Sequence, residues 1–454
     1  MKSSFLQDLS DFITETEPLI ERVDELSKET AIELYSMYET AAMAATQNIE
    51  IIDTELRVVL CDRLDRILEQ IIGISSSLGQ IDLHGIYTPA IHTYRRWGNV
   101  ELLKDKGLTG YMLAKELGTR PIMMFGTNPA EYTNKDLLPE LEILYTDVEA
   151  GDSRVYFEHL HKEHLKMDIL ILHGMYNETI GYLDTYRKYR PNGKVYCGLD
   201  MNRYWMERIT WDSVAVSNFS KQCDIIGTSC RSLRDALNRN PKVSFPCRWI
   251  PNGFLNPFNT TVMADSGIKK NIILTVGRIG TSQKNNGELL IAFERVYRKM
   301  PGWELRLVGT IEPNFQPFID KYYKVYPHMR KRVTFTGAIS NKSELYREYA
   351  QAKLFVLTSQ IEGGTPNVYA EALFHGCMFI TSDIDAADDI TNFGELGLKY
   401  KRGDIDGLSN SLVKLSLQAD NEKLTKHISK ALLYANKYFD WHRNAKKLAY
   451  MLCR

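Results

Sequence analysis

The sequence has no long run of apolar residues. No window of the 454-residue chain approaches the roughly 18 to 20 apolar residues that a membrane span requires. The first residues include acids such as Asp8 and Glu15, where a signal peptide needs an unbroken apolar stretch. We therefore expect a soluble, cytoplasmic protein with no transmembrane segment.

Cysteine pairs and a dominant charge are also missing. The seven cysteines are scattered, form no CxxC pair and are odd in number, which favours reduced thiols over a disulfide framework. The formal net charge is -1, so the chain lacks the basic signature of a nucleic-acid-binding protein. With 44% hydrophobic and 25% charged residues, the composition is that of a folded globular protein.

No complete metal-binding or cofactor-binding motif is present either: the chain has no HExxH, no GxGxxG and no Walker A loop. We interpret two DxD triplets, at 383–385 and 404–406, as chance or helix capping, with Asp406 as a capping residue. The histidines of EHLHKEH, at 158–164, are interpreted as a solvated helix face rather than a zinc site. We expect no metal and no cofactor.

The length and the charge distribution indicate several parts. A chain of 454 residues exceeds what one hydrophobic core usually serves. Residues 1–80 hold 16 acids and 6 bases, whereas the remaining residues hold 41 acids and 50 bases. Either the basic part handles anions, or an acidic segment simply packs against a basic body.

Residues 1–80 are predicted to be an acidic helical extension. Apolar residues recur at spacings of three and four, as in Leu64, Ile67, Leu68 and Ile71. Pro18 is expected to interrupt the first helix. The extension could form a homo-oligomer, dock an acceptor or cover the next domain.

Two regions alternate short apolar runs with amphipathic stretches, a pattern typical of parallel sheets covered by helices. We predict Rossmann-like domains at 81–255 and 271–435, and a terminal helix at 436–454 that packs back on the first domain. Ligands of such sheets bind beyond the carboxyl ends of the strands, so the cleft between the domains is the expected site.

The clearest motif is SQIEGGTPNVYAEALFHG at 359–376, where an apolar strand runs into a glycine turn and a helix. We predict Thr365 as the N-cap, Pro366 as the first helical residue and Gly376 as the C-terminal cap. The first-turn N–H groups and the turn suit a phosphate oxygen. The residues assigned to this phosphate-binding turn are Gly364, Thr365, Pro366, Asn367 and Val368.

A cationic pair follows an earlier strand. The strand at 271–277 ends in Gly277-Arg278, and Lys284 comes shortly after it. Two cations beside a helix N-terminus can neutralise a diphosphate leaving group.

From 271 to 451 the sequence resembles the nucleotide-sugar-binding domain of the family 4 retaining glycosyltransferases, which have the GT-B architecture. The similarity runs in order through ILTVGRIG and its lysine, ELRLVG, VTFTGAIS, LFVLTSQIEGGTPNVYAEALFHG and FDWHRNAKKL. The resemblance implies that Arg278 and Lys284 hold the donor diphosphate. It also implies that Glu362 contacts the donor sugar, that Glu371 contacts the ribose, and that Ile339 lies near the base.

The chain departs from the family pattern in two places. Eight residues separate Glu362 from Glu371 instead of the usual seven, most simply through an added glycine at 363–364. Many relatives also have a histidine after a mid-domain strand, whereas the corresponding strand here ends in Asp200. His173, which closes the preceding strand, and Asp200 are therefore the catalytic candidates of the first domain, alongside Glu362.

The expected fold is α/β, with two Rossmann-like domains (GT-B) facing across a cleft and an extra N-terminal helical region. The resemblance implies a retaining hexosyltransferase that moves a sugar from a nucleoside-diphosphate sugar, UDP-sugar favoured over GDP-sugar, to an acceptor hydroxyl. A protein and a surface glycan are both open as acceptors. A sugar-nucleotide epimerase of similar architecture and a non-catalytic sugar-nucleotide-binding module are the alternative functions.

Overall fold

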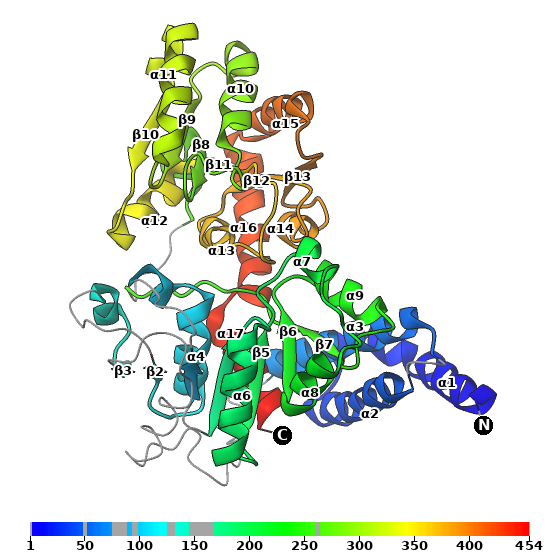
Figure 1. Ribbon diagram of the computed structural model, residues 1–454. Helices are drawn as coiled ribbons and strands as arrows, with labels where there is room; N and C mark the ends of the chain where they lie inside the picture. The colour runs from blue at the N-terminus through cyan, green and yellow to red at the C-terminus, as the bar shows by residue number, and fades with distance from the viewer. Residues whose placement is uncertain are drawn as a thin grey trace. The chain divides into compact units, whose positions relative to one another are not determined.

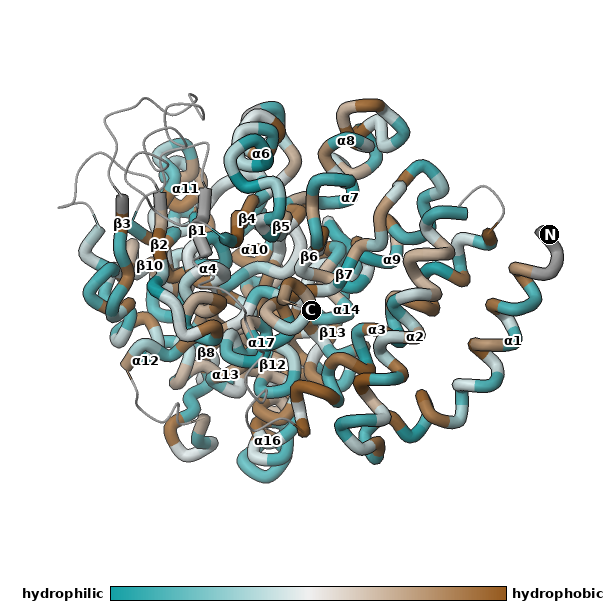
Figure 2. The backbone as a smooth tube through the Cα atoms, turned by 90° about the horizontal axis from the view of Figure 1, so that it is seen from below, coloured by the Kyte–Doolittle hydropathy of each residue, from teal (hydrophilic) through white to brown (hydrophobic). Residues whose placement is uncertain are grey.

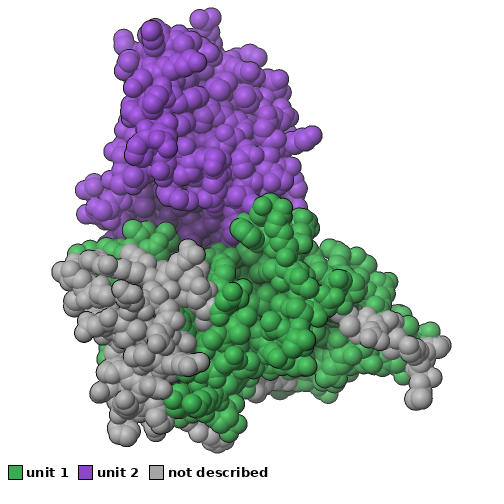
Figure 3. Space-filling view, in the orientation of Figure 1, with its two compact units in different colours: residues 1–251, 441–454 green, residues 252–440 purple. Residues whose placement is uncertain are grey.

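The computed structural model describes residues 2–48, 52–74, 89–92, 99–124, 132–144, 168–258 and 264–453. The chain divides into two compact units (Figure 3). Unit 1 comprises Met1–Pro251 and Trp441–Arg454, and unit 2 comprises Asn252–Asp440. Within the described ranges, no helix combines the length and the apolarity needed to cross a bilayer.

Unit 1 is built on a seven-stranded parallel sheet of order β3-β2-β1-β4-β5-β6-β7 (Figure 1). The strands are β1 (Pro89–His92), β2 (Ile122–Met124), β3 (Glu142–Leu144), β4 (Ile169–His173), β5 (Lys194–Gly198), β6 (Ile225–Thr228) and β7 (Cys247–Trp249). The chain winds outward from β1 to β3 and then returns to place β4 on the other side of β1. Such a reversal is the switch point at which open parallel sheets bind ligands.

Helices from both ends of the chain complete unit 1. Those that follow the strands are α4 (Asp105–Glu116), α6 (Asn177–Tyr189), α7 (Arg203–Met206), α8 (Val214–Gln222) and α9 (Arg231–Arg239). The last helix, α17 (Trp441–Leu452), packs against α4 and α3 although it lies at the far end of the sequence. The terminal segment therefore belongs to the same compact unit as the first sheet.

The N-terminal region forms three helices, α1 (Lys2–Glu21), α2 (Lys28–Gln47) and α3 (Thr54–Ile74). Hydrophobic and hydrophilic residues alternate along them at helical spacing (Figure 2). Ser27 caps α2 by accepting a hydrogen bond from the Thr30 N–H. The predicted break at Pro18 is wrong, because α1 continues through this residue and ends at Glu21. Pro18 stands in the last turn, where few hydrogen bonds remain to be lost.

Acids of α3 pair with bases of the Rossmann-like part of unit 1, where Arg234 lies in α9 and Arg248 lies in β7. Arg234 donates to Asp65 at 2.8 Å and to Asp62 at 2.9 Å, and Arg248 donates to Asp65 at 3.1 Å. Glu69, also on α3, accepts from Arg443 of α17 at 3.2 Å. These pairs favour the packing explanation of the charge asymmetry, in which the acidic segment covers a basic body.

Unit 2 contains a six-stranded parallel sheet of order β10-β9-β8-β11-β12-β13. The strands are β8 (Lys270–Val276), β9 (Glu304–Val308), β10 (Val333–Gly337), β11 (Ala352–Leu357), β12 (Met378–Ser382) and β13 (Gly397–Tyr400). The switch point lies between β8 and β11, so the loops that follow these two strands meet at one edge.

Seven helices of unit 2 are described around this sheet. They are α10 (Asn286–Val296), α11 (Gln316–Val325), α12 (Lys342–Gln351), α13 (Asn367–Phe374), α14 (Ala387–Thr391), α15 (Ile405–Gln418) and α16 (Asn421–Tyr438). The apolar faces of α10, α11, α15 and α16 share one buried core with the strands, which includes Ile273, Phe293 and Leu354. Two parallel sheets with covering helices confirm the α/β prediction.

Glycines terminate three neighbouring strands of unit 2. Gly277 and Gly309 follow β8 and β9, with φ angles of 151° and 145°. A Cβ atom on Gly309 would lie 1.7 Å from the Gly277 carbonyl oxygen, so no side chain fits there. Gly337 ends β10 with a φ of 73°. Because they lack side chains, these glycines let the main chains of neighbouring strands approach closely at the edge where the loop from β8 to α10 begins.

Candidate active site

The loop between β8 and α10 places two cations at the carboxyl edge of the unit 2 sheet. The main chain of Lys284 is held on both sides: its N–H donates to Thr281 at 3.1 Å, and its carbonyl accepts from the Thr358 hydroxyl at 2.8 Å. The Lys284 side chain is 16% exposed, whereas Arg278 is exposed. Lys284 is thus a fixed cation, and Arg278 is accessible to a ligand.

Glu362 lies against this loop. Its carboxylate forms an ion pair with Lys284 and accepts hydrogen bonds from the Ser359 hydroxyl at 2.5 Å and the Gln283 amide at 3.2 Å. The side chain is 9% exposed. The loops meet because β8 and β11 are neighbours, and the Gln360 N–H joins them by donating to the Gln283 carbonyl at 2.7 Å. The structure therefore brings together Glu362 and Lys284, which lie far apart in sequence.

The turn after Glu362 leads into α13. Gly364 adopts a left-handed φ of 78°, which suits a glycine. The helix begins at Asn367 with Pro366 as its N-cap, so the prediction of Thr365 as N-cap is wrong by one residue. Thr365 is buried, and its carbonyl accepts from the Asn252 amide at 2.7 Å, which holds this residue ahead of the helix. The partly exposed first turn, with Asn367 and Val368, still offers N–H groups to an anion.

Glu371 lies in α13 and is bound by α12. Its carboxylate accepts from Lys342 at 2.9 Å and from the Tyr349 hydroxyl at 2.7 Å. Burial and the Glu371 carboxylate raise the pKa of Tyr349 well above its usual value, so this hydroxyl remains a donor. Ile339 is half-buried in the loop between β10 and α12, which also carries Lys342. Glu371 is thus hydrogen-bonded to α12, the helix that follows the Ile339 loop in sequence.

Unit 1 carries a second polar cluster at its own switch point. His173 ends β4, Asp200 follows β5, and Lys106 lies in the first turn of α4. Lys106 pairs with Asp200 at 3.0 Å. Burial lowers the pKa of His173, while Asp105 and Asp200 oppose this effect. The two predicted residues of this domain therefore share one electrostatic environment, in which His173 is a neutral imidazole at neutral pH.

Several residues of these clusters were not identified from the sequence. They are Lys106 in unit 1 and Gln283, Lys342, Tyr349 and Ser359 in unit 2. Gln283 and Ser359 adjoin the recognised motifs, so their closeness in sequence was an available signal. Lys342 and Tyr349 reach Glu371 only through the packing of α12 on α13, which no local spacing reveals.

The acidic triplets have structural partners. Asp383 accepts from the Arg402 side chain at 2.8 Å. Asp404 caps α15 by accepting from the Gly407 N–H at 2.8 Å, whereas Asp406 pairs with Arg295 at 2.6 Å. The prediction of Asp406 as the cap is therefore wrong, because the helix begins at Ile405. In the part of the chain that the structure describes, no group of three or more His, Cys, Asp or Glu side chains is placed to hold a metal. The histidines at 158–164 lie outside that part.

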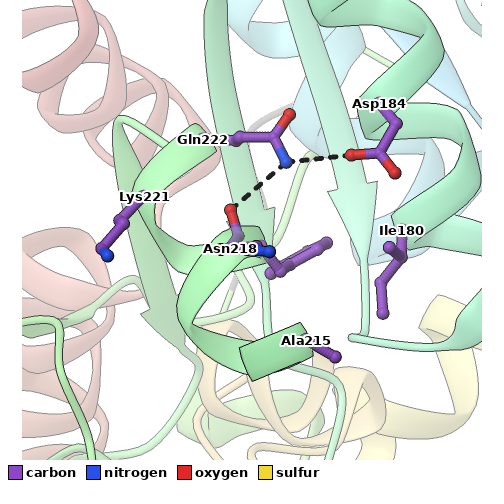
Figure 4. Close-up of a pocket in the computed structure, with 7 residues that line it drawn as sticks. Ile180, Asp184, Ala215, Asn218, Lys221 and Gln222 are labelled. Atoms are coloured by element: carbon purple, nitrogen blue, oxygen red, sulfur yellow. Dashed lines mark hydrogen bonds between the residues drawn. The ribbon is translucent and has the colours of Figure 1, made fainter. Parts of the chain in front are cut away.

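A cavity of about 390 Å³ lies between α6 and α8 of unit 1 (Figure 4). Gln222 spans it, donating from its amide to Asp184 at 2.9 Å and to the Asn218 carbonyl at 3.2 Å. None of the predicted site residues lines this cavity. We therefore assign the site to the loops at the strand ends.

A family comparison identifies the domain that contains the unit 2 cluster. Residues 270–418 match the family described as Glycosyl transferases group 1. This segment includes Arg278, Lys284, Glu362 and Glu371. The comparison with curated proteins found no match.

Solved structures share the fold over most of the chain. HepE from Anabaena, in complex with UDP, is 15% identical with a TM-score of 0.59, and the match covers 80% of this chain and 98% of HepE. A glycosyltransferase from Rickettsia africae is 14% identical with a TM-score of 0.59, covering 80% and 97% of the two chains. Sucrose-phosphate synthase from Thermosynechococcus elongatus is 18% identical with a TM-score of 0.58, covering 79% and 96%.

The architecture defined by these similarities is the GT-B fold, as predicted. Together with the group 1 domain, it supports a glycosyltransferase.

Proposed function

We propose that the chain is a retaining glycosyltransferase of family 4, a hexosyltransferase that uses a UDP-sugar as donor. The observation that carries the proposal is the cluster of Arg278, Lys284 and Glu362 beside the first turn of α13, inside the group 1 domain. It supplies the two things that sugar transfer needs: positive charge for a departing diphosphate and a carboxylate for sugar hydroxyls.

The donor is held in unit 2. Arg278 and Lys284 bind the diphosphate, and the first-turn N–H groups of α13 add the partial positive charge of a helix N-terminus. Glu362 accepts hydrogen bonds from the sugar, and Glu371 accepts them from the ribose beside Ile339. Because these groups themselves carry the positive charge, we propose that neither a metal nor a cofactor is required.

The reaction exchanges one C–O bond for another. The bond between the anomeric carbon and the diphosphate oxygen breaks, while the acceptor oxygen bonds to the same carbon from the same face. The proton of the acceptor hydroxyl passes to the departing phosphate oxygen, and the nucleoside diphosphate leaves. Attack from the face of the leaving group preserves the anomeric configuration. His173 and Asp200 are the catalytic candidates of unit 1.

Complexes of a structural neighbour support the choice of UDP over GDP. HepE, a structural neighbour, is described in complexes with UDP, with UDP and glucose, and with UDP-glucose. A glycan or a protein as acceptor, a cytoplasmic location and a homo-oligomer through residues 1–80 remain proposals from the sequence.

A thermal-shift panel with UDP-sugars and GDP-sugars, with and without Mg²⁺, tests the donor. A nucleotide sugar at a concentration of 100 times its Kd should add about 2.7 kcal/mol to the free energy of unfolding. We expect a shift with UDP-sugars that needs no Mg²⁺ and that Lys284→Ala abolishes. Lys299→Ala is the matched control, since this exposed lysine lies in the short 3-10 helix Tyr297–Lys299 that follows α10. No shift with any nucleotide sugar would contradict the proposal, and interconversion of sugars without an acceptor would indicate an epimerase.

A further inference from the structure

The side chain of Gln283 connects Arg278 to Glu362. Its amide oxygen accepts from the Arg278 guanidinium at 2.9 Å, and its amide nitrogen donates to Glu362 Oε2 at 3.2 Å. The same nitrogen donates to the Ile361 carbonyl at 3.1 Å. One neutral side chain therefore contacts both the exposed cation and the carboxylate of the site.

Only one orientation of this amide suits its surroundings. If oxygen and nitrogen were exchanged, two N–H groups would face the guanidinium, and the oxygen would face a carboxylate and a carbonyl. An amide has both a donor end and an acceptor end, a combination that neither a carboxylate nor an ammonium offers. The contacts of Gln283 thus require a residue that is an acceptor toward arginine and a donor toward glutamate.

We propose that Gln283 is a positioning residue that keeps Arg278 and Glu362 apart, so that the arginine stays available to the donor diphosphate and the glutamate to the donor sugar. The proposal rests on the proposed function. Without the amide, an exposed guanidinium beside a carboxylate gains most by pairing with it directly. Lys284 is already paired with Glu362, so a direct pair with Arg278 would also neutralise the second cation of the site.

The main chain of Gln283 has a separate structural role. Its carbonyl accepts from the Gln360 N–H, which joins the two loops whatever side chain is present. Substitutions of the side chain therefore remove the spacer and leave this loop contact in place.

The test compares Gln283→Leu and Gln283→Glu with the wild-type protein, using UDP-glucose as the probe donor. Gln351→Leu and Gln351→Glu are matched controls, because the Gln351 oxygen also accepts from a cation, Lys270, at 3.1 Å. Gln351 lies at the end of α12, beside the start of β11 and away from the loops of the site. Donor hydrolysis and UDP-glucose binding are measured as functions of pH, and the Gln283→Leu protein is crystallised.

We expect Gln283→Leu to lower kcat/KM for UDP-glucose about 10-fold or more, as does loss of a hydrogen bond to a charged group. Gln283→Glu should be at least as impaired near pH 8, because its carboxylate repels Glu362. It should recover in part as the pH falls toward about 4.5, near the ordinary pKa of a glutamate, where protonation begins to restore a neutral donor and acceptor. Gln283→Leu and both Gln351 variants should show no such recovery.

The crystal structure of Gln283→Leu should show Arg278 paired with Glu362. Arg278 and Glu362 in their wild-type positions, or unchanged kcat/KM for Gln283→Leu in an active wild-type background, would overturn the spacer role alone. A wild-type protein that neither binds nor hydrolyses any nucleotide sugar would overturn the proposed function, and the spacer role with it.

Discussion

Lys284 and Glu362 form a largely buried ion pair. The two side chains are 16% and 9% exposed, and Ser359 and Gln283 supply further hydrogen bonds to the carboxylate. Removing one member of such a pair leaves the other charge poorly solvated. The pair therefore fixes the carboxylate and the ammonium in place, while Arg278 adds a cation that a ligand can reach.

Replacement of Lys284 by Ala should remove positive charge from the leaving group. We expect kcat/KM for UDP-glucose to fall, because the transition state loses roughly 2 to 4 kcal/mol of stabilisation. This is the cost of removing one hydrogen-bond donor from a developing anion. Steady-state kinetics of donor hydrolysis measure this loss, with Lys299→Ala as the matched control. Unchanged kcat/KM in Lys284→Ala would contradict the role assigned to this residue.

The residues at the strand ends were largely predictable, but their partners were not. Short sequence motifs with recognisable spacing contain four of these residues, namely Arg278, Lys284, Glu362 and Glu371. Lys342 contacts Glu371 only after α12 packs on α13, so the contact depends on the fold rather than on local pattern.

At the scale of single elements, α13 shows which end of a helix was predictable. Gly376 has a φ of 68°, its N–H donates to the Leu373 carbonyl at 2.9 Å, and the Cys377 N–H donates to the Ala372 carbonyl at 3.1 Å. This pair of bonds is the Schellman motif that the glycine predicted. The N-cap prediction failed because the hydrogen bond from Asn252 to Thr365, a contact distant in sequence, decides where the helix begins.

Replacement of Gly376 by Ala should destabilise unit 2 through two effects. The left-handed backbone disfavours a side chain by about 1 kcal/mol, and the new Cβ would lie 2.8 Å from Ile428 Cγ1. Gly403→Ala separates the two effects, because Gly403 has a φ of 79° with no atom within 4 Å of the new Cβ. Urea unfolding should show a larger loss for Gly376→Ala than for Gly403→Ala. Equal losses would mean that Ile428 moves aside without cost.

At the scale of the whole molecule, the sequence-level charge asymmetry has a structural explanation in unit 1. Asp65 accepts from both Arg234 and Arg248, which are 2% and 5% exposed. The sequence showed that an acidic segment precedes a basic body, but it left open whether the two parts pack together. Composition contains no pairing information, so only the folded chain identifies Asp65 as the shared acid.

Asp65→Ala should destabilise unit 1 by about 3 to 5 kcal/mol, because it leaves two buried guanidinium groups without this carboxylate. Asp62→Ala is the control, since Asp62 pairs with the same arginine but its side chain is 44% exposed. That change should cost about 1 kcal/mol or less. Urea unfolding combined with hydrogen exchange of α3 amides measures both. A mild effect of Asp65→Ala would mean that the helices contribute little to unit 1.

Two buried histidines should make unit 2 sensitive to acid. Burial lowers the pKa of His375 and of His427 from 6.5 to about 4 in each case. The unfolded chain therefore binds protons at higher pH than the folded chain, and stability falls as the pH drops from 6.5 toward 4. By pH 4, each histidine should lower the free energy of unfolding by about 3 kcal/mol.

Unfolding free energies across this pH range test the effect. The test uses a double variant, His375→Asn with His427→Gln. The Asn amide can replace the His375 ring nitrogen at the Glu371 carbonyl, and the Gln amide can replace the His427 ring nitrogen at the Cys377 carbonyl. The stability of the double variant should depend less steeply on pH than that of the wild type. An unchanged slope would assign the acid sensitivity to other groups.

The two Rossmann-like sheets were the most predictable feature of the whole chain. Buried parallel strands such as β4, with all five residues buried, appear in the sequence as unbroken apolar runs between helices. The sequence supports a specific functional hypothesis only where residues at strand ends carry charge, as in unit 2. In unit 1 the sequence supplied His173 and Asp200, but not Lys106, which joins them.

We propose that the unit 2 cluster holds a nucleotide sugar for transfer with retention. A time-resolved proton NMR spectrum of the sugar released from UDP-glucose, recorded before its anomers equilibrate, tests this directly. We expect slow release of α-glucose, the configuration of the donor, and loss of this release in Lys284→Ala. Release of β-glucose, or release that Lys284→Ala leaves unchanged, would contradict this proposal.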